Sequence, residues 1–162
     1  MTPEQATFLR DFLLKAIEDE YPTTRQVIAA VPDDKSNYRT DPKSMTAREL
    51  AWHIIDAELL FLKGVAAGAF TASEPTVNGT TNIAEMLEVY DAGFNEGIAN
   101  IRNLNAADLT RFISFFDIFN YRAVEYLNFL LQHSIHHRGQ LSKYLRPMGS
   151  KVPPIYGASA DA

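Results

Sequence analysis

Four long segments of this chain carry apolar residues at the spacing of an amphipathic helix, and this periodicity restricts the fold more than any other feature. In such segments the apolar side chains recur every three or four residues and form a stripe along one side of a helix. Residues typical of turns, namely Pro, Gly, Asp, Asn and Ser, are concentrated between the segments. Four amphipathic helices of comparable length close most simply around one shared core. The sequence therefore predicts an all-α chain that folds as a four-helix bundle.

Local signals indicate where these helices begin and end. Thr46 and Glu49 have the spacing of a capping box, which starts the second segment. The last segment ends before Pro147, because a proline disfavours helical backbone at the preceding residue. Pro22 lies inside the first segment, where it deletes a backbone hydrogen bond, so we expect a kink or a weakened turn there. The predicted helices cover about residues 3–31, 46–68, 82–104 and 120–146.

Two stretches fall outside this helical pattern. Residues 112–119 are apolar and aromatic without a helical cap, and we expect either a short extended piece or a lid over one end of the bundle. Residues 148–162 contain too much Pro and Gly to continue the last helix, and we expect this tail to pack across the bundle before a loose end. Residues 1–162 are therefore interpreted as one domain.

The composition argues against several classes of protein. The chain has 162 residues, 46% of them hydrophobic, which suits one compact domain with a sizeable core. Its formal net charge of -5 and its lack of basic, aromatic-rich clusters argue against a nucleic-acid partner. No segment is typical of a signal peptide or a membrane span, so a cytoplasmic location is the default expectation. Because there is no cysteine, a bound metal needs nitrogen and oxygen ligands.

Three of the four histidines lie in one octapeptide, from His133 to Gln140, and the fourth is His53. A helix turns by about 100° per residue, so His133 and His137 share one face and can bind one ion together. His53 is predicted to point inward near the middle of the second helix, where it can supply a third ligand. His136 is turned by about 100° from His137 and is assigned a supporting or packing role. The predicted ligands thus occupy core positions.

The burial of these imidazoles has two explanations. A single inward histidine is usually a core residue whose ring is satisfied by a carbonyl or a carboxylate. Three together favour a shared metal, because each polar ring without a partner costs about 1–3 kcal/mol on burial. Glu49 and Gln140 lie one helical turn from predicted ligands, and each either orients a ligand or is a polar residue at the helix rim. Arg138 points away from the ligands and is interpreted as a surface or interhelical ion-pair residue.

The segment HSIHHRGQ, followed by LSKYLRPMG and PPIYG, resembles the C-terminal signature of the DinB family, also called DinB/YfiT-like proteins. The segment ARELAWH, which ends at His53, resembles that family's first ligand helix. The resemblance implies an up-down-down-up four-helix bundle with a long crossover connection and a homodimer. It also implies a divalent ion, such as nickel or zinc, on His53, His133 and His137. The family is similar in fold to thiol-dependent transferases and isomerases, but this chain has no distinct thiol-recognition motif.

Two functions fit such a site. The first is a metal-dependent enzyme that activates a low-molecular-weight thiol or a water for transfer to, or hydrolysis of, a small-molecule substrate. The second is a non-catalytic, metal-stapled bundle that acts as a structural or stress-related interaction protein. A structural site should have a fourth protein ligand such as Glu49, whereas a catalytic site should have a cavity beside the ion. Nickel and zinc are the expected ions, with iron and manganese as alternatives, because three imidazoles accept several first-row metals.

Overall fold

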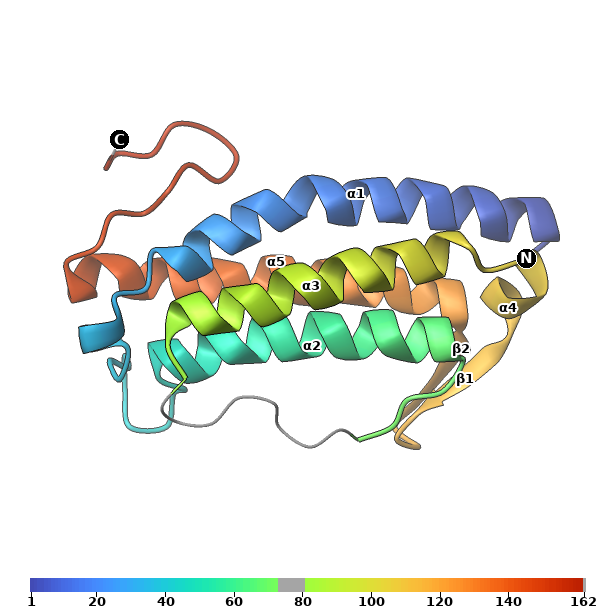
Figure 1. Ribbon diagram of the computed structural model, residues 1–162, viewed down its shortest axis with the longest axis horizontal. Helices are drawn as coiled ribbons and strands as arrows, with labels where there is room; N and C mark the ends of the chain where they lie inside the picture. Colours follow the sequence, from blue (N-terminus) through green and yellow to red (C-terminus); the bar gives the residue numbers. More distant parts are fainter. Residues whose placement is uncertain (73–80, 162) are drawn as a thin grey trace.

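The computed structural model describes residues 1–72 and 81–161, and within these ranges most residues are helical. Four long helices lie side by side, and a short helix and a strand pair lie together at one end of them (Figure 1). The helices α2 and α3 run in the same direction, whereas α1 and α5 run in the opposite direction (Figure 1). In chain order the elements are α1 (Pro3–Ala29), a 3-10 helix (Asp33–Lys35), α2 (Ala47–Ala67), α3 (Ile83–Arg102), α4 (Ala106–Thr110), β1 (Phe112–Phe115), β2 (Phe119–Arg122), α5 (Ala123–Leu145) and a second 3-10 helix (Arg146–Met148). The segment between α2 and α3, where a long crossover connection is expected, includes residues 73–80, which lie outside the described residues.

The capping signals in the sequence correspond to helix starts in the structure. The Thr46 hydroxyl accepts from the Glu49 N–H at 3.2 Å, and the Glu49 carboxylate accepts from the Thr46 N–H at 2.7 Å. The same reciprocal pair forms at the start of α3 between Asn82 and Glu85. Such caps satisfy N–H groups that have no partner inside the helix and each contribute about 1 kcal/mol. The start of α2 is therefore fixed by local chemistry, nearly two turns before His53.

The first helix continues as one element through Pro22. Tertiary contacts on both sides of the proline hold it to α3: the Arg25 guanidinium binds both oxygens of Asp91 at 2.8 and 2.9 Å, and the Tyr21 hydroxyl donates to the same carboxylate. The Tyr21 ring also stacks on Phe94, with 4.0 Å between ring centroids. These contacts compensate for the backbone hydrogen bond that the proline deletes.

The core lies between the long helices. The predicted inward stripe of the first helix is buried at Thr24, Ile28 and Val31, but not in the N-terminal half of the helix. The helical spacing of apolar residues predicts Phe8 and Phe12 on the same stripe as Thr24 and Ile28, but the two phenylalanines are 71% and 62% exposed. The buried residues of this helix are Ala6, Leu13, Leu14, Ile17, Thr24, Val27 and Ile28. Adjacent stripes of α1 both carry apolar residues, so periodicity alone did not decide which one faces the other helices.

The segment 112–119 forms most of an antiparallel hairpin, which corrects the all-α prediction. Phe115 pairs with Phe119, and the turn between them contains Phe116 and Asp117 at φ of 49° and 60°. The Tyr126 hydroxyl, at the start of α5, donates to the Ile113 carbonyl at 2.8 Å and ties the hairpin to the helix. The extended alternative for this segment is therefore confirmed, and α5 begins at residue 123 rather than near residue 120.

The C-terminal tail folds back along the helices. The Ser150 hydroxyl donates to the Ala30 carbonyl at 2.6 Å, and the Arg146 guanidinium lies 2.9 Å from the Asp161 carboxylate. The Tyr156 ring lies beneath the guanidinium of Arg138, with 5.2 Å from Cζ to the ring centroid. The tail was expected to pack across the bundle before a loose end, and these contacts hold most of it against the helices. Among the described residues, no helix combines the length and the apolar character that crossing a membrane requires.

Candidate metal centre

Two adjacent helices bring together the three histidines that the sequence singled out. His53 comes from α2, and His133 and His137 come from successive turns of α5. Each ring has a nitrogen within 4.8 Å of a nitrogen on the other two. Nε2 of His53 and Nε2 of His137 lie 3.3 Å apart. Residues 80 positions apart in the chain therefore converge on one point.

The centre lies at the rim of the core rather than inside it, which corrects the predicted core positions. All three rings are partly buried. The fully buried stripe of α5 runs instead through Leu130, Ser134, Arg138 and Leu141. A rim position leaves the three histidines shielded on the protein side and partly exposed on the other.

Gln140 fixes the orientation of His137. Its side-chain Oε1 lies 2.8 Å from His137 Nδ1, and because an amide oxygen only accepts, Nδ1 carries the proton. The Nε2 atom of His137 then presents a lone pair toward His53. On its other side, Gln140 Nε2 lies 3.0 Å from His136 Nε2 and donates to it. One glutamine thus sets the tautomers of both adjacent imidazoles, as outer groups do for metal-binding histidines.

The donor set fits a cation. Metal–nitrogen bonds of about 2.05 Å in a tetrahedral site separate neighbouring ligand atoms by about 3.3 Å, and the Nε2 atoms of His53 and His137 have that spacing. Nδ1 of His133 is buried and, within residues 1–72 and 81–161, has no hydrogen-bond partner. Without a cation, a His53 N–H can satisfy His137 Nε2, but this leaves the His133 nitrogen uncompensated. A buried nitrogen of this kind costs about 1–3 kcal/mol.

The surroundings keep all three rings neutral at pH 7. Burial, followed by repulsion from the neighbouring histidines, lowers the pKa of His133 to about 4. Burial is also the main cause of the lowered pKa of His53, followed by repulsion from His137. For His137, burial outweighs the opposing hydrogen bond from Gln140, and the pKa is again lowered. Neutral imidazole is the form that binds metals, so an ion would not have to displace protons here.

The other two sequence candidates lie beside the centre. His136 is exposed, and its ring meets His137 edge to face with 4.8 Å between centroids. The Glu49 carboxylate is engaged in the cap of α2, where it accepts from the Thr46 N–H and hydroxyl at 2.7 and 2.9 Å. These hydrogen bonds lower the Glu49 pKa. Among the described residues, the cluster of potential ligands includes no carboxylate.

Two cavities open beside the histidines. One, of about 590 Å³, reaches His137 and Gln140, and the other, of about 510 Å³, reaches His53 and Glu49. Ser44 and Met45, in the loop before α2, line both cavities. Volumes of this size suit small molecules. The centre therefore combines shielded nitrogens with space for a ligand on either side of this loop.

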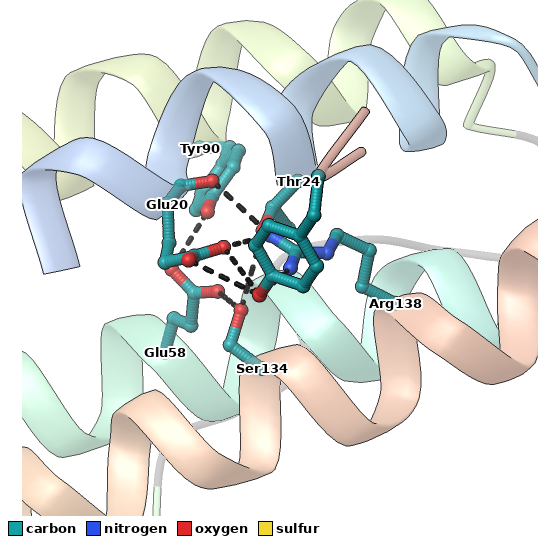
Figure 2. A network of polar contacts seen from close by, with 7 residues as sticks. Glu20, Thr24, Glu58, Tyr90, Ser134 and Arg138 are labelled. Carbon is teal, nitrogen blue, oxygen red and sulfur yellow. Dashed lines mark hydrogen bonds and ion pairs between the residues drawn. The ribbon is translucent and has the colours of Figure 1, made fainter. Parts of the chain in front are cut away.

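A buried polar network crosses the same helices, and sequence reasoning missed most of it (Figure 2). Glu58 is 3% exposed and accepts from the hydroxyls of Tyr90, at 2.6 Å, and Ser134. Burial raises the Glu58 pKa to about 7, although both hydroxyls and Arg138 oppose the rise. The sequence feature that could have revealed the burial of Glu58 was its position, four residues after the buried Ile54 on an apolar helix.

Arg138 is the cation of this network. Of the two roles predicted for it, a surface residue or an interhelical ion-pair residue, the second is correct. Its guanidinium is 1% exposed, forms an ion pair with the Glu20 carboxylate of α1 and donates to the Thr24 hydroxyl at 3.2 Å (Figure 2). The Tyr156 hydroxyl accepts from the same guanidinium at 2.6 Å. Arginine at this position therefore joins α1, α5 and the tail and lies away from the histidine nitrogens.

Comparisons with known proteins agree with this architecture. The model of the DinB family matches residues 5–161. The Bacillus subtilis protein YrdA is 24% identical over 152 residues, which cover 93% of this chain and 90% of YrdA. The crystal structure of the DinB-like protein YjoA from Bacillus subtilis superposes with a TM-score of 0.72 at 22% identity, over 89% of this chain and 96% of that one. A mycothiol-dependent maleylpyruvate isomerase gives a TM-score of 0.54 at 11% identity, over 87% of this chain and 61% of that one.

Proposed function

The chain belongs to the DinB family, and on that premise we propose that it is a metal-dependent enzyme acting on a small molecule. His53, His133 and His137 would hold a divalent ion, and the reaction would be transfer of a thiol to the substrate or hydrolysis by water. The observation that carries this proposal is the convergence of three neutral imidazoles beside two cavities, with the buried His133 Nδ1 lacking a hydrogen-bond partner in the part of the chain that the structure describes.

The roles of the residues follow from their contacts. Gln140 holds His137 with its Nε2 lone pair facing the other two rings. Burial keeps the rings neutral, and the cavities admit the reactants. When bound, a divalent ion supplies Lewis acidity, which lowers the pKa of a thiol or water that it binds and polarises substrate oxygen atoms. Nickel or zinc is the proposed ion, with iron or manganese as alternatives, since three nitrogen ligands accept several first-row metals.

The thiol route has support from fold similarity alone. The isomerase that superposes on this chain is mycothiol-dependent, and we extend thiol use to this protein as part of the proposal. The hydrolytic route rests on the chemistry of an accessible three-histidine site. The proposal also includes the four-helix-bundle topology of the DinB/YfiT type, a homodimer and a cytoplasmic location. The parallel directions of α2 and α3 support that topology (Figure 1).

The alternative is a metal that only staples α2 to α5. A structural site normally has four protein ligands, and the expected fourth ligand was Glu49. Its carboxylate is engaged in the cap of α2, and within the described residues no carboxylate joins the three histidines. These observations favour an open site and hence the enzyme.

Two measurements test the proposal. Elemental analysis of the purified full-length protein should find a divalent metal near one equivalent per chain, and His133→Ala should lose it. His136→Ala is the matched control and should retain the metal, because that ring lies beside the cluster. Incubation with a reduced thiol and a generic electrophile should then show a rate that a chelator abolishes. Metal content unchanged in His133→Ala, or a rate indifferent to the chelator, would contradict the proposal.

A further inference from the structure

The two cavities beside the histidines differ in charge. The described residues that line the cavity next to His53 include two cations, Arg39 and Lys43, and two carboxylates, Glu49 and Asp56. Among the described residues, those that line the cavity next to His137 include one formally charged side chain, the Lys143 ammonium, and no carboxylate. Positive charge without a compensating carboxylate is unusual in a chain with a net charge of -5. The His137 cavity therefore favours a negatively charged occupant.

Lys143 is available to such an occupant. It lies in the last turns of α5, six residues after His137, so the two Cα atoms are separated by about 9 Å along the helix axis. Long side chains of a helix lean toward its N-terminus, which directs Lys143 back toward Gln140 and His137. Within residues 1–72 and 81–161, its ammonium group has no ion pair or hydrogen bond. The Asp41 carboxylate, on the nearby loop, accepts from the Ser44 hydroxyl and the Lys43 N–H and does not line this cavity.

The rest of the cavity wall is amphipathic. Met45 and Leu50 supply apolar surface to the same cavity that Lys143 and His137 line. Tyr144 contributes its ring, and its hydroxyl donates to the Met45 carbonyl at 3.3 Å. A volume of about 590 Å³ accommodates a small organic molecule but not a folded partner.

We propose that the cavity beside His137 binds a small organic anion, whose negatively charged head group pairs with Lys143 and whose apolar body contacts Met45 and Leu50. This inference rests on the proposed function, since the molecule is taken to be the substrate of the metal centre. The head group is a carboxylate or a phosphate, which present the same charge to a lysine. The geometry places the opposite end of the molecule at the histidines, where the reaction would occur.

The test compares four probes that share one apolar chain: hexanoate, hexyl phosphate, hexan-1-ol and hexylamine. NMR titrations of the full-length, zinc-loaded protein follow the backbone amides around Leu50 and Gln140. At least one anion should bind about fivefold more tightly than the alcohol, and the amine should bind most weakly, since an accessible ion pair contributes about 1 kcal/mol. The tighter of the two anions identifies the head group. Equal binding of anions and alcohol would overturn the proposal.

Variants locate the charge that is responsible. Lys143→Gln should lose about the same fivefold for the anion while leaving hexan-1-ol unchanged, and Lys143→Arg should stay within about twofold of the wild type. Lys43→Gln is the matched control, because it removes one exposed cation from the other cavity. An equal loss in Lys43→Gln would indicate a general charge effect and overturn the assignment. An anion that binds to Lys143→Gln as tightly as to the wild type would be a ligand of the metal alone, and this result would also overturn the assignment.

The titrations are repeated on chelator-treated protein, with metal content measured separately. A protein that never holds metal contradicts the proposed function, yet its selectivity for anions through Lys143 still tests this inference. A metal-bound protein without that selectivity overturns the inference alone. Lys143 also complements the carbonyl end of α5, but that structural role would lower stability in Lys143→Gln without changing the ratio of anion to alcohol affinity.

Discussion

Replacing Glu58 with Gln should make the stability of the metal-free protein less dependent on pH. Glu58 is 3% exposed, and burial raises its pKa from the ordinary value of 4.5 to about 7. Because the folded-state pKa lies above that of the unfolded chain, Glu58 contributes its full stability below pH 4.5 and loses it as the pH rises through about 7. The whole shift corresponds to about 3 kcal/mol, of which about 2.5 kcal/mol falls between about pH 5 and pH 8.

Urea unfolding of chelator-treated wild type and Glu58→Gln, in steps from about pH 5 to pH 8, measures this contribution. The free energy of unfolding of the wild type should fall relative to that of the variant by about 2.5 kcal/mol over this range. Subtracting the two free energies of unfolding removes the contribution of the histidines, because they are present in both proteins. Their contribution to stability rises with pH, opposite to that of Glu58. Glu88→Gln, which removes an exposed carboxylate of α3, is the control for lost charge. A difference that stays constant within about 0.5 kcal/mol would show that Arg138 keeps Glu58 ionised, and would refute the reasoning.

Two further predictions concern the histidines. Gln140→Ala should weaken metal affinity about tenfold, because His137 loses the acceptor that fixes its tautomer. His137→Ala should weaken metal affinity far more. A competition assay with a chelator measures both affinities, and equal losses would make Gln140 a ligand in its own right. Metal should remain bound well below pH 6.5, since the pKa of His133 is lowered to about 4 and those of His53 and His137 are also lowered. Dialysis at stepped pH followed by elemental analysis checks this, and release that begins at the pKa of a free imidazole would count against it.

The parts of the site that the sequence predicted are those fixed by local geometry. His133 and His137 share a face because they are four residues apart on a helix, and the cap at Thr46 and Glu49 begins α2 where expected. Gln140 could be placed beside His137 for the same reason. These relations depend on a few neighbouring residues and on nothing else in the chain.

The incorrect predictions concern features that depend on tertiary packing. Helical spacing did not decide which of two adjacent stripes of a helix is buried. Phe8 and Phe12 were therefore expected on the buried side of α1, and the histidines were expected in the core rather than at its rim. The hairpin was left open because its pairing depends on distant partners, such as the hydroxyl of Tyr126. Glu58 was overlooked because its burial is tolerated only with the hydroxyls that other helices bring to it.

The contact of Tyr156 with Arg138 makes the end of the chain part of the charge balance of the interior. The guanidinium is 1% exposed, and the tail supplies both a phenolic acceptor and an aromatic face that shields it from water. A protease that removed the tail would therefore uncover a cation and leave one of its N–H groups without its partner. Substitutions at Tyr156, Arg138 and Glu20 should accordingly be constrained jointly during sequence divergence, even though the tyrosine lies in what looks like a dispensable terminus.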